Sequence, residues 1–158
     1  MKLAQVVLLA LATLLALPAV AQTKPASSDM EILRQKIKAD KKLVVAANME
    51  LTEAEAKGFW PVYESYQKEL QAINDRVAKT VIAYADAYNK GPVSNETAKK
   101  LIGEAIAIDE AEVKMKRAYL PKLEKVIPGM KVARYVQIES KIRAIIKYEL
   151  AANIPLVQ

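Results

Sequence analysis

A helical pattern of unusual length constrains how this chain folds. Between residues 51 and 90, bulky apolar side chains recur every three or four residues, close to the 3.6-residue period of an α-helix. No turn signal interrupts them before Gly91-Pro92, a pair typical of a helix end. One helix over this range would be roughly 55 Å long, so its apolar stripe needs a partner of similar length. The stripe consists of Phe59, Tyr63, Tyr66, Leu70, Ile73, Val77, Val81, Tyr84 and Tyr88.

The beginning of this long helix is marked by Thr52 and, three residues later, Glu55. A threonine and a glutamate at this spacing form a capping box, in which each side chain accepts a hydrogen bond from the other residue's backbone N–H. Gly58 and Pro61 then break the local rules for a helix. Either the helix ends at Trp60, or it continues with a kink at Pro61. We expect the kink, because the apolar stripe keeps its phase across the proline.

Three further helices are expected around the long one. A second capping box, at Ser28, begins a helix over about residues 29–47. After the turn at Pro92-Val93-Ser94, a third helix is capped by Ser94 or Asn95 and continues to about Val126. A fourth helix begins with Pro128 in its first turn and continues to about Ala152, while Pro121 predicts a bend or break late in the third. The expected buried faces are Met30, Leu33, Ile37 and Val44 in the first helix, Leu101, Ala105, Ile108, Ala111, Met115 and Ala118 in the third, and Tyr135, Ile138, Ile142 and Ile145 in the fourth.

The first helix is expected to be basic on its opposite face, through Arg34, Lys36, Lys38, Lys41 and Lys42.

No alternating pattern long enough for a strand is present. The sequence therefore predicts an all-α fold: four helices in a single domain over residues 29–152, built on a long bent antiparallel hairpin of the second and third helices. Residues 153–158 are expected to form a C-terminal tail.

The first 21 residues resemble a secretory signal peptide. Lys2 is followed by an apolar run of about 15 residues, shorter than the ~20 needed to span a bilayer. Ala19 and Ala21 then give an A-x-A site, with cleavage expected between Ala21 and Gln22. The alternative is a membrane anchor. Residues 22–28 would form a flexible leader, and the expected location is the periplasm.

Positive charge is concentrated between residues 114 and 147. Ten basic residues and only two acidic ones, Glu124 and Glu139, give this window a net charge of +8. Such asymmetry predicts a directed surface field, which attracts acidic partners at long range. The alternative is an ordinary solvated helix surface.

Most catalytic and metal-binding chemistry is hard to place in this sequence. It contains no Cys and no His, so it lacks the usual nucleophile, general base and transition-metal ligands. Asp109, Glu110 and Glu112 cluster near Glu104, but residues on one helix diverge, and a solvated face is the simpler interpretation. We expect no enzyme activity, no cofactor and no metal. No nucleic-acid motif accompanies the basic window, so nucleic acid is not an expected partner.

The basic window mixes its cations with apolar side chains, a combination that attracts a protein by charge and holds it by adaptable contacts. Trp60 lies off the apolar stripe and is the expected exposed aromatic contact, whereas the aromatic residues on the stripe are expected in the core. The candidate residues for binding a client or partner are Lys114, Met115, Arg117, Tyr119, Lys122, Met130, Lys131, Arg134, Lys141, Arg143 and Trp60.

Two short segments carry a resemblance to a known family. Leu51, Thr52 and Glu55 follow the pattern L-T-x-x-Q with Glu in place of Gln, and Ile127-Pro128-Gly129-Met130-Lys131 keeps the apolar start. An aromatic residue follows each segment at the same offset, Phe59 and Tyr135. With its order of helices, the chain resembles a divergent member of the Spy/CpxP family of periplasmic proteins.

This resemblance implies a four-helix, hairpin-based cradle, often an antiparallel homodimer, and ATP-independent chaperoning or envelope-stress signalling. We therefore expect a periplasmic chaperone-like protein that binds unfolded or envelope proteins. Two alternatives stay open. One is a regulatory module that binds a membrane sensor, and the other is a structural protein that contacts the cell wall or an anionic membrane surface.

Overall fold

The computed structural model describes residues 41–158, and these residues contain only helices and their connections. A helical segment covers residues 41–49 and is followed by α3 (Glu53–Asn89), α4 (Asn95–Glu124) and α5 (Gly129–Asn153). The predicted all-α class is confirmed. Residues 1–40, which carry the expected signal peptide, leader and most of the first helix, lie outside the described part.

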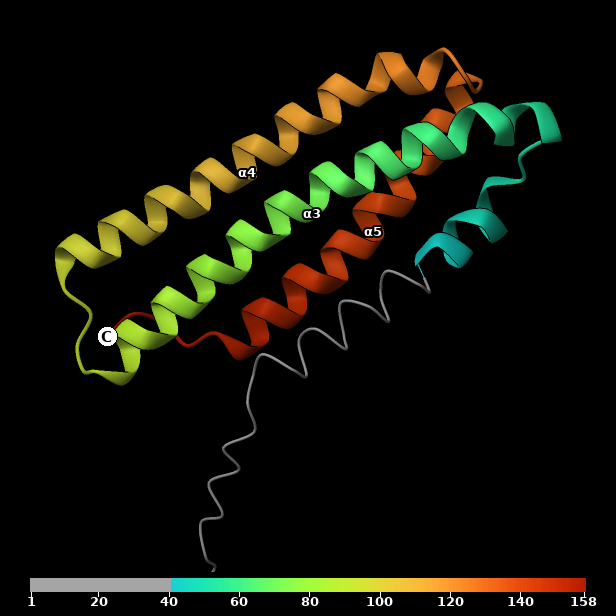
Figure 1. Ribbon diagram of the computed structural model, residues 1–158. Coiled ribbons are helices and arrows are strands. Elements are labelled where there is room, and N and C mark those ends of the chain that lie inside the picture. The colour runs from blue at the N-terminus through green and yellow to red at the C-terminus, as the bar shows by residue number, and fades with distance from the viewer. Residues whose placement is uncertain (1–40) are drawn as a thin grey trace, which may run out of the picture. The chain divides into compact units, whose positions relative to one another are not determined.

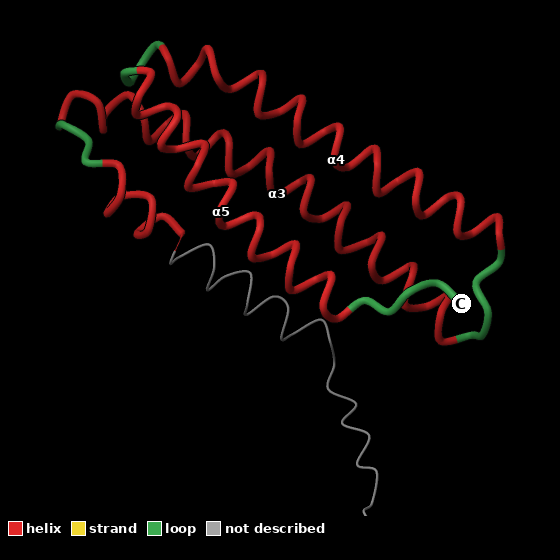
Figure 2. Tube along the Cα trace, turned by 180° about the vertical axis from the view of Figure 1, so that it is seen from behind, coloured by secondary structure: helices red, strands yellow, loops and turns green. Residues whose placement is uncertain are grey.

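Helices α3 and α4 form the long pair predicted from the sequence. Residues 90–94 join them, and the two helices lie side by side along most of their length (Figure 1). Figure 2 shows α5 returning along the same bundle after the short connection that follows α4. The backbones of α3 and α4 approach closely, whereas those of α3 and α5 stay further apart. Large side chains must therefore fill the space between α3 and α5.

The capping box at the beginning of α3 is present as predicted. The Thr52 backbone N–H donates to Glu55 Oε2 at 2.8 Å, and the Glu55 N–H donates to Thr52 Oγ1 at 3.3 Å. Lys131 of α5 adds an ion pair to Glu55 at 2.6 Å, and its hydrogen bond, with that from Thr52, holds the pKa of Glu55 below its usual value of 4.5. At the other end of α3, Gly91 adopts a φ of 127°, which a glycine tolerates far better than other residues.

Neither internal proline divides its helix. Pro61 lies within α3, so the alternative of a helix end at Trp60 is wrong, and the kink itself stays a prediction. Pro121 lies within α4, which continues to Glu124.

Gly58 has a clear packing role, because a Cβ atom built there would lie 2.9 Å from Val126 Cβ. The glycine thus lets α3 approach the connection between α4 and α5.

The core is a cluster of aromatic rings surrounded by aliphatic side chains. The Tyr135 ring of α5 packs edge-on against Phe59 at a centroid distance of 5.2 Å and against Tyr66 at 5.6 Å. Tyr66 also meets Tyr119 of α4 at 5.2 Å, so rings from three helices interlock. The predicted α3 stripe is buried at Phe59, Tyr63, Tyr66, Leu70 and Ile73, and only partly covered at Val77, Val81, Tyr84 and Tyr88.

The predicted buried faces of α4 and α5 need correction. In α4, Ala118 is exposed and Tyr119 is buried instead, so the inner face follows Ile108, Glu112, Met115, Tyr119 and Leu123. The larger ring occupies the core because it reaches Tyr66, which an alanine methyl group is too short to do. In α5, Ile145 is 64% exposed, since the buried face ends at Glu139.

The helical segment of residues 41–49 also differs from the prediction. Val44 was expected on the buried face but is exposed, and Val45 and Met49 are buried in its place. Lys41, expected on the outer basic face, is 9% exposed. In this orientation Lys41 forms an ion pair with Glu139 inside the bundle.

The two motif-like segments come together in space. Glu55 and Lys131 occupy equivalent positions in them, 76 residues apart, and form an ion pair. The aromatic residues that follow at the same offset, Phe59 and Tyr135, stack edge-on. The sequence echo therefore corresponds to a pairing between the first turns of α3 and α5.

Candidate functional site

A buried carboxylate joins α3, α4 and α5. Glu112 of α4 is 4% exposed and accepts hydrogen bonds from Lys116 at 2.7 Å and from Arg143 Nε at 2.8 Å. Arg143 also donates to Asn74 Oδ1 at 2.6 Å. Burial alone would raise the pKa of Glu112, but the two cations outweigh it and hold this pKa below 4.5. An ionised, buried carboxylate with fixed partners on neighbouring helices holds those helices in position relative to one another.

A second buried network ties residues 41–49 to the bundle. Lys41 Nζ donates to Glu139 Oε2 at 2.7 Å and to Gln67 Oε1 at 2.8 Å. Gln67 Nε2 in turn donates to Glu139 Oε1 at 2.8 Å and to the Tyr135 hydroxyl oxygen at 3.2 Å. Within residues 41–158, no buried side-chain N or O atom lacks a hydrogen-bond partner. These polar groups satisfy one another, so we assign them a structural role.

The outward face of α4 has a different character. Four large aliphatic side chains are exposed there: Ile102 (60%), Ile106 (54%), Val113 (50%) and Leu120 (37%). Their spacing places them along one side of the helix, away from the buried face. We call these four residues the α4 stripe. Single exposed aliphatic residues are common, but a row of them along one helix indicates a contact surface.

Charged side chains flank the α4 stripe. A shallow surface depression is lined by Ile106, Val113, Asp109, Glu110, Lys114 and Arg117. Asp109 makes an ion pair with Lys147 of α5 at 2.9 Å. Lys114, Arg117 and Glu110 make no ion pair with residues of the described part of the chain. Two cations next to exposed aliphatic groups make this a mixed basic and apolar surface, although Ile106 and Val113 are not among the predicted binding residues.

Several predicted binding residues lie elsewhere. Met115 and Tyr119 are 2% and 4% exposed, so the expectation that they contact a client is wrong: both belong to the core. Arg143 is tied to Glu112 and Asn74, and Lys131 is tied to Glu55. These cations hold helices together, so they are not part of the candidate binding surface.

The remaining predicted residues are spread over the molecule. Lys122 is exposed, with its Nζ 4.0 Å from the centroid of the Tyr119 ring. Met130 is 84% exposed at the beginning of α5. Arg134 pairs with Glu50 at 3.4 Å, and Lys141 is exposed on α5. Only Lys114 and Arg117 lie in the depression beside the α4 stripe.

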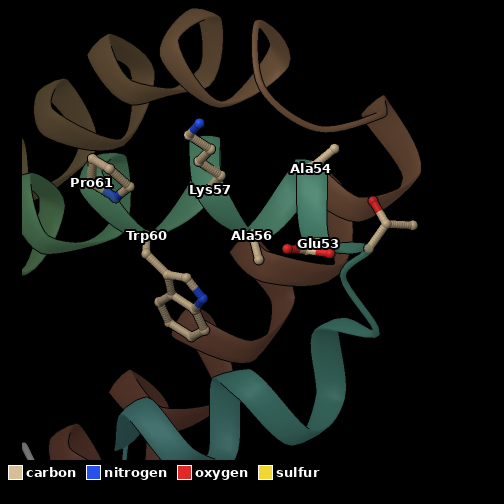
Figure 3. Close-up of a pocket in the computed structure, with 7 residues that line it drawn as sticks. Glu53, Ala54, Ala56, Lys57, Trp60 and Pro61 are labelled. Atoms are coloured by element: carbon tan, nitrogen blue, oxygen red, sulfur yellow. The ribbon is translucent and has the colours of Figure 1, made fainter.

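Trp60 is a partly covered member of the aromatic cluster. Its ring packs edge-on against Phe59 and Tyr63, at 5.1 and 5.3 Å, and Lys42 Nζ lies 5.2 Å from the ring centroid. Figure 3 shows the side chain pointing from α3 toward the helical segment of residues 41–49. The expected free aromatic contact is therefore replaced by a ring that helps to join this segment to α3.

Sequence reasoning missed most of the α4 stripe. The helix carries two apolar rows, and the sequence analysis predicts only the row containing Met115. The spacing of Ile102, Ile106, Val113 and Leu120 was a second, equally regular signal. Only the packing of Tyr119 shows which row faces inward.

Residues 41–158 contain neither a metal-binding cluster nor a membrane-spanning helix. No group of three or more His, Cys, Asp and Glu side chains is arranged to hold a metal ion there. None of the helices in this range combines the length and hydrophobicity needed to cross a membrane.

Comparison of the chain with protein-family models, with curated proteins and with solved structures gave no match.

Proposed function

We propose that this protein binds non-native segments of other proteins, without ATP, through the α4 stripe and the cations next to it. One observation carries the proposal: four exposed aliphatic side chains follow one face of α4 while Lys114 and Arg117 project beside them. The cations would draw an acidic unfolded segment toward the surface, and the aliphatic groups would hold it.

The charge distribution supports a role for attraction at long range. In the basic window, Lys114, Arg117, Lys122, Lys125 and Lys141 make no ion pair with the described residues, whereas its other five cations do. The resemblance to periplasmic chaperone-like proteins points the same way. The proposal includes export of the protein, with cleavage of its signal peptide after Ala21. It assigns the protein no reaction and no cofactor.

The test is an aggregation assay with an acidic unfolded client, stoichiometric protein and no nucleotide. The wild type should suppress aggregation, and Ile106→Ser with Val113→Ser should abolish most of that suppression. The matched control is Ile145→Ser with Tyr148→Ser, which removes two side chains from α5 that are somewhat more exposed than Ile106 and Val113. Both double variants should keep their helicity, since exposed substitutions usually change stability by about 0.5 kcal/mol or less.

Salt provides a second measurement. The Debye length falls from roughly 8 Å at physiological ionic strength to about 3 Å at 1 M. Association with the client should therefore slow as salt rises, and Lys114→Glu with Arg117→Glu should slow it at low salt. Equal loss of suppression in the α5 control, or tight binding only to vesicles or to one folded partner, would refute the proposal.

A further inference from the structure

The α4 stripe repeats along its helix with a spacing that a helical partner shares. Ile106, Val113 and Leu120 are seven residues apart, so they lie almost in line, at intervals of about 10.5 Å along the axis. A second helix presents its own side chains at the same interval of about 10.5 Å every seven residues. An extended segment instead presents side chains to one face about every 6.8 Å. An extended segment is therefore out of step with the stripe from the second contact onward.

The depression beside the stripe matches the arrangement by which helices pack. When two helices pack closely, each side chain of one enters a hole between four residues of the other, at positions i, i+3, i+4 and i+7. The depression is lined by two such sets in succession, residues 106, 109, 110 and 113 and then residues 110, 113, 114 and 117. Its lining thus provides consecutive holes for two side chains of a facing helix.

The backbone of a bound segment gives a second reason to expect a helix. A buried N–H or C=O group without a hydrogen bond is costly in free energy. The aliphatic side chains of the stripe neither donate nor accept hydrogen bonds, and the backbone of α4 around Val113 is already bonded within its own helix. An extended segment on this surface would leave part of its backbone unpaired, whereas a helix pairs its backbone internally.

The charges of α4 indicate the sign of the partner. Lys114 and Arg117 lie directly beside the stripe, and the only carboxylates in the depression are Asp109, which is paired with Lys147, and Glu110. Exposed cations of α4 that make no ion pair with residues 41–158 outnumber the carboxylates in the same state: they are Lys99, Lys100, Lys114, Arg117 and Lys122, against Glu96, Glu110 and Glu124. Carboxylates on a partner are therefore attracted, and cations are repelled.

We infer that the α4 stripe binds an amphipathic helix of another protein, about 18 residues long, with aliphatic side chains seven residues apart and carboxylates beside them. The length follows from the stripe, since Ile102 and Leu120 are about 27 Å apart along the axis. The partner's aliphatic side chains enter the holes around Val113, and its carboxylates lie near Lys114 and Arg117. This inference rests on the proposed function in that it names the clients: non-native segments that are helical when bound.

Binding of two synthetic peptides to the full chain tests the inference. The first is an acidic peptide of about 18 residues with leucines seven residues apart, and the second has one central, solvent-facing residue replaced by proline. Both peptides keep the same leucines, but the proline disrupts the helix. Fluorescence anisotropy should show binding of the proline peptide weakened by about tenfold or more. Circular dichroism should show that the first peptide gains helicity when it binds.

An exchange of two neighbouring residues of α4 tests the spacing at constant composition. Val113→Lys with Lys114→Val moves the middle aliphatic side chain by about 100° around the helix. This variant should bind the helical peptide about tenfold or more weakly, since the row of aliphatic groups is interrupted. The matched control is Tyr148→Glu with Glu149→Tyr, an exchange of two exposed residues on α5, which should leave the affinity within about twofold.

Four results would overturn the inference: no binding of the helical peptide, equal affinity for both peptides, no gain of helicity, or full binding by the exchange variant of α4. The aggregation assay is interpreted separately. Suppression through the stripe with equal affinity for both peptides would leave the proposed function standing and overturn the helical form of the client. Binding of the helical peptide without any suppression would refute the proposed function and leave α4 as a site for a helical partner.

Discussion

The three long helices divide into a packed half and an open half. The packed half comprises residues 53–73 of α3, 108–124 of α4 and 129–139 of α5, and it holds every buried side chain of the three helices. The open half comprises residues 74–89, 95–107 and 140–153, where Ile82, Ile102 and Ile145 are each at least 60% exposed. Both halves are rich in apolar residues, so apolar content alone does not determine burial.

The difference lies in the size of the side chains that face the centre. The packed half places five aromatic rings between the helices: Phe59, Tyr63, Tyr66, Tyr119 and Tyr135. In the open half, α4 presents mainly small residues such as Ala98, Ala105 and Ala107, and Val77, Val81, Tyr84 and Tyr88 of α3 stay only partly covered. Stability should therefore reside in the packed half, and the open half should respond weakly to substitution.

The largest effect is expected from alkaline pH. Burial, followed by nearby carboxylates, raises the pKa of Tyr63 to about 12, and burial also raises the pKa values of Tyr66 and Tyr135. A phenol with a raised pKa in the folded state stabilises the fold fully below its unfolded pKa of about 10. That contribution is lost as pH rises above 10.

We therefore predict that tyrosinate absorbance and loss of helicity rise together in an alkaline titration. The packed half must open before its phenols ionise. Tyr63→Phe should move the transition to higher pH, because it removes one of these groups. Complete ionisation of all seven tyrosines with helicity unchanged would show that the aromatic core is accessible to solvent.

Truncation of two tyrosines on α5 compares the halves directly. Tyr135 is 1% exposed and Tyr148 is 72% exposed. Tyr135→Ala should lower the free energy of unfolding by about 4 kcal/mol, through lost burial and the cavity that remains. Tyr148→Ala should change it by about 0.5 kcal/mol or less. Similar urea midpoints for the two variants would contradict the division into halves.

Two ion pairs between α4 and α5 sharpen the boundary between the halves. The side chains of Arg143 and Glu112 are 11% and 5% exposed, whereas those of Lys147 and Asp109, one turn further along, are 52% and 64% exposed. Arg143→Met should cost about 3 kcal/mol, because it leaves a buried carboxylate with one cation fewer. Lys147→Met should cost less than about 1 kcal/mol. Denaturant melts measure both, and equal costs would place the boundary elsewhere.

The smallest effects are expected from two glycine-to-alanine substitutions, which should change the free energy of unfolding in opposite directions in the two halves. Gly58→Ala should destabilise the protein by about 1–2 kcal/mol, since the new methyl group overlaps Val126 and this outweighs the gain in helix propensity. Gly103 lies in α4 with nothing within 4 Å of the added Cβ atom, so Gly103→Ala should stabilise by up to about 1 kcal/mol. Thermal melts with shifts of the same sign would refute the close approach at Gly58.

Periodicity and helix-end chemistry predicted much of this architecture. The capping box at Thr52, the turn at Gly91 and the inner row of α3 from Phe59 to Ile73 follow from local rules and are present. The choice between the two apolar rows of α4 depends on which ring fits between three helices. That choice is made by contacts such as Tyr66 with Tyr119, between residues far apart in the sequence.

The candidate site was harder to predict for the same reason. Lys114 and Arg117 were identified by charge alone, and both lie beside the α4 stripe. Met115 and Tyr119 are predicted as client contacts because cations surround them in the sequence, although both face inward and Met115 also belongs to the predicted buried face of the third helix. Lys41, expected on the outer basic face, is likewise buried, since its ion pair with Glu139 forms across 98 residues and leaves no local signal in the sequence.

The pairing of Glu55 with Lys131 and of Phe59 with Tyr135 also sets the order in which the molecule acquires structure. These partners lie 76 residues apart, so their contacts form only after α5 has been added to the chain. Contacts near the 90–94 turn are local and close a much shorter loop, which costs less entropy. During synthesis, the half that forms first is therefore the weaker one. The aromatic residues of α3 stay uncovered until the last quarter of the chain arrives.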